Sequence, residues 1–275
     1  MTGNIFTPRG YTDLACERVR ATGAGVSFER KRASVGVWER IHTKEDMTDN
    51  GGLRAGHYHS LHTNKIENMD SFECEDAAEE IGSELWRLCE LNTIMPKRVL
   101  AVGLGNERLA PDALGPLTAK AIEATMHLKG DAPELFSALG CTEIAVIRPG
   151  VYSESGIETA DAVGAMCDRL KPELVILIDA LCATSEERLG TTVQLSDVGI
   201  FPGSGVGNPR AEISGKALGC GVITIGIPTV IDSGILSSRN RGERMLVTPR
   251  YINPIIDTGA RIIAGAINRA FGVIR

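Results

Sequence analysis

The chain has 275 residues, of which 43% are hydrophobic and 23% are charged, and its formal net charge is −6. This length can bury a full core and leaves room for at most two ordinary domains. A general nucleic-acid binder would carry a basic excess, so we expect no direct nucleic-acid partner. The sequence contains no apolar run of about 18 residues and no apolar stretch near residue 1, so we expect neither a membrane span nor a secretory signal.

The cysteines indicate a reducing compartment. There are seven of them, an odd number, and no two have the CxxC spacing that redox motifs and many zinc sites share. Several lie inside apolar stretches, where a free thiol packs as a small hydrophobic group. We therefore expect no disulfides and a cytoplasmic location.

The first third of the chain predicts a β-rich subregion over residues 25–65. The segments VSFERKR, VGVWERI and HYHSLHT alternate between apolar and polar residues, which is typical of strands. Residues 75–93 follow with an apolar stripe at helical spacing and predict an amphipathic helix.

From residue 97 onward, short apolar runs alternate with helical segments. The runs are RVLAVGLG, EIAVIRPG, ELVILIDA and GVITIGIP, and residues 249–271 follow as one or two helices with Pro254 as the place for a kink. Strands that are apolar on both faces and alternate with helices indicate a parallel sheet covered on both sides. We therefore predict an α/β fold, a mostly parallel doubly wound sheet flanked by helices, with its core in residues 97–275.

Two loops of this sheet carry candidate catalytic carboxylates. Asp112 lies in GLGNERLAPDALGP, after the first apolar run, and Asp179 ends the run LVILID. Ligands of open parallel sheets bind beyond the carboxyl ends of the strands. Taken singly, Asp112 is also consistent with a helix cap and Asp179 with an acceptor for loop amides.

Together, the two aspartates predict a dyad. Close carboxylates cannot both ionise easily, so one pKa rises and the pair can share a proton. One carboxylate then acts as general base on water, while the other acts as the acid that protonates the leaving amine. This chemistry hydrolyses peptide bonds.

A third loop, DVGIFPGSGVGNPR at residues 197–210, predicts an oxygen-binding nest. Gly203 and Gly205 permit backbone amides to point inward, although a plain surface loop is the alternative. Asn106, in the first loop, and Asn208, in the third, complete the predicted substrate-binding set.

Histidines offer a weaker metal hypothesis. His57 and His59 would share one side of a strand, with His62 as a third ligand, but they fall in the β-rich subregion and not at the crevice. A solvated edge strand is the simpler interpretation, and we expect neither a metal nor another cofactor.

Several blocks of the chain resemble the spore germination protease family in order along the sequence. These blocks are GLGNERLAPDALGP, RPGVYSESGIETAD, LVILIDALCATS, TTVQLSDVGIFPGSGVGNPR and ITIGIPTVID, together with YTDLACE near the N-terminus. The resemblance implies an α/β fold related to hydrogenase-maturation endopeptidases. It implies an endopeptidase that initiates degradation of small acid-soluble spore proteins during germination, in the forespore or spore core, and that assembles as a homotetramer. The family's two essential aspartates fall on Asp112 and Asp179.

The resemblance also implies a zymogen. Residues 1–13 would be a propeptide removed by self-cleavage between Asp13 and Leu14, leaving residues 14–275 as a single α/β peptidase domain. Two departures stand out: only residues 237–244 occupy the place of a longer family insert, and Phe201 stands where a histidine is expected. Alternatives are a hydrogenase-maturation-type processing endopeptidase and a non-catalytic sporulation protein with the same fold.

Overall fold

The computed structural model describes residues 11–19, 25–47, 53–203, 210–232 and 245–272, and within them nine strands form one sheet. The strands are β1 (Val26–Arg32), β2 (Gly36–Thr43), β3 (Gly56–Thr63), β4 (Arg98–Gly103), β5 (Glu143–Ile147), β6 (Leu174–Ala183), β7 (Thr192–Ser196), β8 (Gly221–Asp232) and β9 (Leu246–Val247). Their order across the sheet is β1-β2-β3-β7-β8-β6-β4-β5, and β9 pairs with the far end of β8.

The half of the sheet that carries the predicted loops is parallel. Strands β8, β6, β4 and β5 run in one direction, and Leu174–Ile178 of β6 are buried without exception. Continuous apolar residues are what a strand covered on both faces requires. The predicted α/β fold with a parallel central sheet is therefore confirmed.

The other half is antiparallel and continues the same sheet. Strands β1, β2 and β3 lie in the predicted β-rich subregion, and β3 pairs with β7, which in turn pairs with β8. The interpretation of the histidine-bearing strand as a solvated edge is wrong, because β7 covers its second side. Strand β7 reads TVQLS and alternates polar and apolar residues, so the sequence carried a strand signal at this position that the sequence analysis overlooked.

The longest helices are α2 (Ser71–Leu91), α7 (Thr159–Leu170) and α9 (Ile252–Phe271). Shorter ones are α1 (Ala15–Arg18), α3 (Leu114–Ala121), α4 (Leu128–Asp131), α5 (Pro133–Leu139), α6 (Tyr152–Ser155) and α8 (Gly215–Leu218), with single 3₁₀ turns η1 (Ile66–Asn68), η2 (Ala110–Asp112) and η3 (Glu186–Arg188). Among the described helices, none combines the length and apolar character needed to cross a bilayer.

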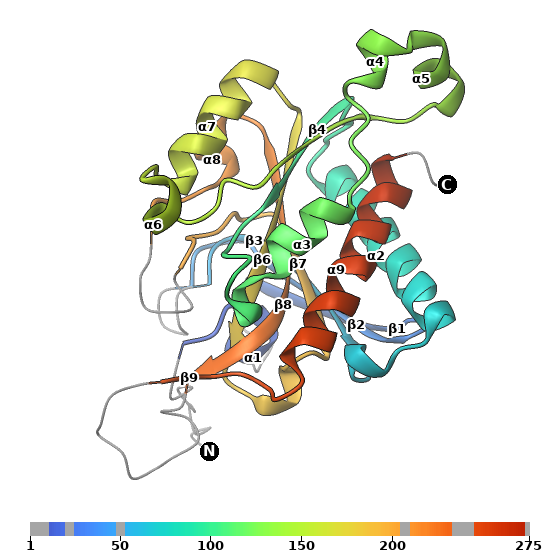
Figure 1. Cartoon of the computed structure of the whole chain (residues 1–275). Coiled ribbons are helices and arrows are strands. Elements are labelled where there is room, and N and C mark those ends of the chain that lie inside the picture. Colours follow the sequence, from blue (N-terminus) through green and yellow to red (C-terminus); the bar gives the residue numbers. More distant parts are fainter. Residues whose placement is uncertain (1–10, 20–24, 48–52, 204–209, 233–244, 273–275) are drawn as a thin grey trace, which may run out of the picture.

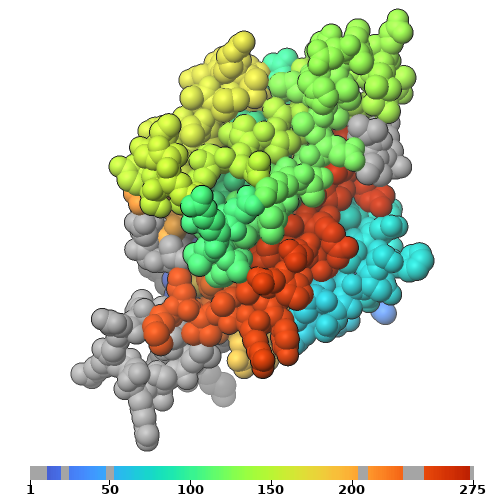
Figure 2. Space-filling view, viewed as in Figure 1, coloured from blue at the N-terminus to red at the C-terminus, as the bar shows by residue number. Residues whose placement is uncertain are grey.

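Helices cover both faces of the sheet. Figure 1 shows α2, α9 and α3 together on one face and α7 on the other, and Figure 2 shows the surface of α9 running between those of α2 and α3. The first core contains Ile176 and Ile178 of β6, and the second contains Val175 and Leu177. Because successive side chains of a strand point to opposite faces, the same strand supports both cores.

The carboxyl ends of the parallel strands meet on one side of the sheet. Here β6 runs on past the end of β4, which pairs with β6 only as far as Ile178. The register between β6 and β8 shifts between Leu181 and Cys182. Such irregularities redirect side chains and backbone groups, and they are common beside active sites.

Candidate active site

A cavity of about 550 Å³ opens beyond the carboxyl ends of β4, β6 and β8. Asp112 and Asp179 both line it, although 67 positions separate them in the sequence. The wall also includes residues from the loop after β5, from the region before α8 and from the chain ahead of α1, namely Tyr152, Arg210 and Asp13. Two carboxyl groups therefore face one cavity at the position where open parallel sheets bind ligands.

Asp112 is held by the loop that leaves β4. It ends the turn η2, and its Oδ2 accepts a hydrogen bond from the Asn106 backbone N–H at 2.8 Å. The Thr229 hydroxyl of β8 ties the turn down by donating to the Pro111 carbonyl at 2.7 Å. Gly105 has φ +107°, and a Cβ there would lie 2.2 Å from the Asp112 carbonyl oxygen, so only glycine fits this bend.

Asp179 projects directly from β6. It follows five buried residues, and its Oδ1 accepts from the next backbone N–H, that of Ala180, at 2.9 Å. Ile178 and Ala180 on either side pack into the core beneath α2 and α9. The Asp179 side chain therefore points to the opposite face, toward the cavity.

Burial shifts both carboxyl groups toward the protonated form, and repulsion from neighbouring carboxylates adds to the shift of Asp179. Burial raises the pKa of Asp112 to about 6, against the opposing hydrogen bond from Asn106. Burial raises the pKa of Asp179 well above its usual range, and the charges of Asp112 and Asp13 raise it further. With a pKa of about 6, Asp112 is mostly a carboxylate near neutral pH, while burial and the neighbouring charges favour the protonated form of Asp179.

A third carboxyl group, that of Asp13, reaches the same cavity. Its backbone N–H donates to the Cys182 carbonyl, and its Oδ2 accepts from the Cys182 N–H, both at 2.8 Å. The Tyr11 hydroxyl donates to its Oδ1 at 2.7 Å. Burial raises the pKa of Asp13, and these hydrogen bonds and the charge of Arg18 only partly oppose the rise.

The rest of the N-terminal segment (residues 11–18) is anchored beside the cavity. Leu14 is completely buried in an apolar cluster with Leu181, Ala183 and Ile231. The carboxylate of Glu17 accepts from the backbone N–H groups of Thr184 at 2.7 Å and of Ser185 at 2.9 Å. The segment thus lies across the candidate site in a defined conformation, with Asp13 next to the two predicted catalytic aspartates.

The other predicted substrate-binding residues have different surroundings. Gly203 lines the cavity. Asn106 supports Asp112 through its backbone, and its side chain accepts from the Arg108 N–H at 2.8 Å, so its contact with substrate stays a prediction. Gly205 and Asn208 lie outside the described residues.

The sequence reasoning missed Thr229 and Arg210, which also line the cavity. Thr229 follows the fourth apolar run in IPTVID. The rule that identified Asp112 and Asp179, a polar residue beyond a buried parallel strand, would have found it too. Arg210 lies before α8, with its Nη1 3.2 Å from Glu158, and nothing in the local sequence pattern indicates that position.

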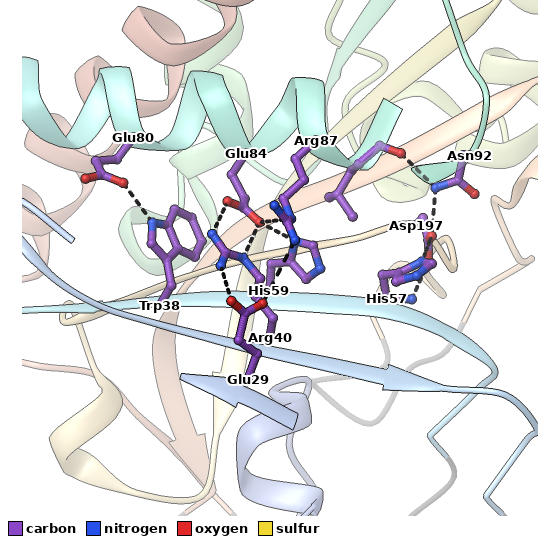
Figure 3. A network of polar contacts seen from close by, with 11 residues as sticks. Glu29, Trp38, Arg40, His57, His59, Glu80, Glu84, Arg87, Asn92 and Asp197 are labelled. Carbon is purple, nitrogen blue, oxygen red and sulfur yellow. Dashed lines mark hydrogen bonds and ion pairs between the residues drawn. The ribbon is translucent and has the colours of Figure 1, made fainter. Parts of the chain in front are cut away.

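Three histidines of the β-rich subregion each lie within hydrogen-bonding distance of a carboxylate, and Figure 3 shows two of them, His57 and His59. His57 Nδ1 lies 2.7 Å from Asp197, and His59 Nδ1 lies 2.6 Å from Glu84, while His62 Nε2 lies 2.9 Å from Glu39. His62 is three positions from His59 and points to the opposite face of β3, so the three rings cannot share one ion.

His62 does belong to a group of potential ligands with Cys16 and Glu39, whose donor atoms lie within 4.8 Å of one another. However, the Arg188 guanidinium lies 2.7 Å from His62 Nδ1. Burial also raises the pKa of the Cys16 thiol to about 12. A neighbouring cation and a protonated thiol both disfavour metal binding.

Comparison with known proteins places the chain in a family. The model of the germination protease family matches residues 15–240. The germination protease of Oceanobacillus iheyensis is 42% identical over 215 residues, which cover 78% of this chain and 58% of that protein. The germination protease of Bacillus cereus is 39% identical over 212 residues, which cover 76% of this chain and 57% of that protein. The chain thus matches somewhat more than half the length of these curated relatives.

A solved structure, the [NiFe] hydrogenase maturation protease HycI from Thermococcus kodakarensis, aligns with 63% of this chain and 94% of its own, at 19% identity and a TM-score of 0.37. This similarity is too low to support any argument about the present chain. The family match covers most of the chain, and the relatives exceed 35% identity over three quarters of it. The chain therefore belongs to the germination protease family.

Proposed function

We propose that this chain is an endopeptidase in which Asp112 and Asp179 together activate water for peptide-bond hydrolysis. The observation that carries the proposal is the convergence of the two carboxyl groups on one cavity, where burial raises the pKa of both and the charge of Asp112 raises that of Asp179 further. An adjacent base and acid of this kind are what hydrolysis by a carboxyl pair requires.

In the proposed reaction, Asp112 removes a proton from a water molecule as its oxygen bonds to the carbonyl carbon. Asp179 gives its proton to the leaving nitrogen as the C–N bond breaks, which yields one carboxyl and one amino terminus. A proton transfer from Asp112 to Asp179, directly or through solvent, then restores the starting state. Gly203, at the cavity wall, and Gly205, Asn208 and Asn106 are the proposed substrate-binding residues.

We further propose that residues 1–13 are a propeptide and that the chain cleaves itself between Asp13 and Leu14. The docked N-terminal segment supports this, because Asp13 lies in the same cavity as both aspartates and Leu14 fills an apolar pocket beside it. In this arrangement the segment occupies the site as a substrate would, which would keep the unprocessed chain inactive toward other proteins.

The proposed substrates are small acid-soluble spore proteins, degraded in the spore core during germination, and the proposed assembly is a homotetramer. Membership of a family whose curated relatives are named germination proteases supports the spore setting.

The test is incubation of the purified chain with a small acid-soluble spore protein, with and without a chelator, and mass spectrometry of the products. Asp112→Asn and Asp179→Asn should each lower the cleavage rate by at least 10³-fold while the circular dichroism spectrum is unchanged. Turnover by either variant at the wild-type rate would refute the dyad. Loss of activity in the chelator would show that a metal takes part.

A further inference from the structure

The side chain of Gln194, on β7, hydrogen-bonds to the backbone on both sides of Leu14. Its Nε2 donates to the Asp13 carbonyl oxygen at 2.9 Å, and its Oε1 accepts from the Ala15 N–H at 2.7 Å. A carbonyl can only accept and an N–H can only donate, so these two partners fix the orientation of the amide. The side chain is 6% exposed, so both bonds form away from bulk solvent.

Gln194 lies in one row of the sheet with Asp179. Gln194 pairs with Gly226 of β8, and Gly226 pairs with Asp179 of β6. The neighbours of Gln194, Val193 and Leu195, pack into the core under α2 and α9, as the neighbours of Asp179 do. Both side chains therefore point to the same face, about 10 Å apart at two strand spacings.

Glycine keeps the position between them open. A Cβ on Gly226 would lie 2.4 Å from the Asp179 carbonyl oxygen and 2.8 Å from the Leu181 side chain. The row therefore presents an amide and a carboxyl group on either side of a position without a side chain. Asp13 contacts both parts of this region, since its carbonyl accepts from Gln194 while its carboxyl lines the cavity with Asp179.

We infer that Gln194 is a further catalytic residue, whose amide N–H polarises the carbonyl of the bond to be cleaved and stabilises the oxyanion formed on it. The inference rests on the proposed function, since it takes Asp13–Leu14 as the bond that is hydrolysed. As water adds to the Asp13 carbonyl carbon, the C=O π electrons move to the oxygen that Nε2 already contacts. A donor preorganised in a buried site strengthens as that charge develops, which accelerates the step.

Gln194 could instead be only a tether for the segment, and its two bonds allow the roles to be separated. Gln194→Glu keeps an acceptor for the Ala15 N–H, but in its ionised form it has no donor for the Asp13 carbonyl. Gln194→Met has nearly the same volume and lacks both groups. In its protonated form Gln194→Glu regains an O–H donor, so its defect should shrink on acidification.

The experiment follows self-cleavage of the full chain between residues 13 and 14 by intact-mass spectrometry from pH 5 to 8. Gln194→Glu should be slower than wild type by 10²–10³-fold at pH 8, and the ratio to wild type should recover at least tenfold by pH 5. Dividing by the wild-type rate removes the part of the titration of Asp13, Asp112 and Asp179 that the variant shares with wild type. Gln194→Met should be slow at every pH. Hydrogen exchange at Ala15 reports in parallel whether the segment is docked.

Wild-type rates in both variants would overturn the inference. So would slow cleavage in Gln194→Glu accompanied by loss of protection at Ala15, because Gln194 would then only tether the segment. Failure of the proposed function gives a different result. A wild-type chain that stays intact would overturn both proposals, whereas normal self-cleavage by Asp112→Asn and Asp179→Asn would remove the dyad and leave the Gln194 result standing.

Discussion

Asp13 and Cys182 exchange two hydrogen bonds, one from the Asp13 N–H to the Cys182 carbonyl and one from the Cys182 N–H to the Asp13 carboxylate, both at 2.8 Å. This pairing fixes a third carboxyl group near Asp179, whose pKa the charge of Asp13 helps to raise. Docking of the N-terminal segment therefore places negative charges close together, and a proton relieves the repulsion.

Docking of this segment should accordingly depend on pH. Burial raises the pKa of Asp13 in the docked state, so docking takes up a proton. Docking should be strongest at acidic pH and weaken as the pH rises through the raised pKa of Asp13. Asp112 and Asp179 titrate in the same cavity, and the charge of Arg18 opposes the rise in the pKa of Asp13. The pH dependence of docking therefore reflects these groups together.

Asp13→Asn should tighten docking at pH 8 several-fold and flatten this pH dependence, because the amide can still accept from the Cys182 N–H without a charge. Hydrogen exchange of residues 11–18 between pH 5 and 8 measures it. Tyr11→Phe is the control, since it removes the bond to Asp13 Oδ1 and keeps the charge. An Asp13→Asn variant that retains the full pH dependence would show that Asp13 is not its source.

Asp112 should lower the stability of the fold at neutral pH. Its pKa is about 6 in the folded chain and near 3.8 when unfolded, so the folded state binds more protons between these values. Stability is therefore lost as the pH rises from about 4 through 6. Asp112→Asn should raise the free energy of unfolding at pH 8 by about 1–2 kcal/mol, after allowance for its partial exposure. The gain should vanish near pH 3.5.

Urea denaturation at pH 8 and pH 4 measures this effect. Asp179→Asn should shift stability in the same direction, since its pKa is also raised. Both variants should lose peptidase activity, and such a gain in stability with a loss of activity is the pattern expected of an active-site carboxyl group. A decrease in stability at pH 8 would instead mean that the carboxylates support the fold.

The placement of Asp112 and Asp179 could be predicted because topology alone determines it. Carboxyl ends of parallel strands face one side of the sheet, so the loops that follow two adjacent strands such as β4 and β6 converge. The route of the N-terminal segment could not be predicted in this way. Its contacts join Asp13 to Cys182 and Gln194, more than 160 positions away, and no periodic pattern encodes them.

Strand β7 accounts for two further features that the sequence analysis did not predict, the burial of the β3 histidines and the role of Gln194. Its sequence TVQLS alternates polar and apolar residues, but it is only five residues long and no local feature shows which strands it pairs with. Without a second neighbour for β3, the sequence favours a solvated edge strand for its histidines. With β7 in place, His59 is 2% exposed and Gln194 reaches the N-terminal segment. Pairing between distant strands supplied both features, and local sequence does not specify it.

The buried ion pair between Arg40 and Glu84 should support the fold at neutral pH. Two hydrogen bonds of 2.7 Å join these side chains, which lie on β2 and α2 (Figure 3). Burial opposes ionisation of Glu84, but contacts with His59 and Arg40 outweigh it and lower its pKa to about 2. The stabilisation is therefore present above pH 4.5 and is lost as the pH falls through about 2.

Glu84→Gln should lower the free energy of unfolding at pH 7 by about 2–4 kcal/mol, because it leaves the Arg40 charge buried with only the 3.4 Å contact to Glu29. Urea denaturation at pH 7 is the measurement. Glu79→Gln, on the exposed side of the same helix, should change stability by less than about 0.5 kcal/mol. Equal effects of the two substitutions would contradict a structural role for the pair.

Gly226→Ala tests whether the open position between Gln194 and Asp179 is required. The added methyl group would overlap the Asp179 carbonyl oxygen, which is backbone and cannot turn aside. We expect the free energy of unfolding to fall by about 1–3 kcal/mol and self-cleavage to slow by more than tenfold, since β6 and β8 must move apart where Asp179 is held.

Gly164→Ala is the matched control for Gly226→Ala, because a Cβ in that part of α7 meets nothing within 4 Å. It should raise stability by up to about 1 kcal/mol through helix propensity and leave cleavage unchanged. If Gly226→Ala cleaves itself at the wild-type rate, the spacing of this row is not what aligns the reacting groups.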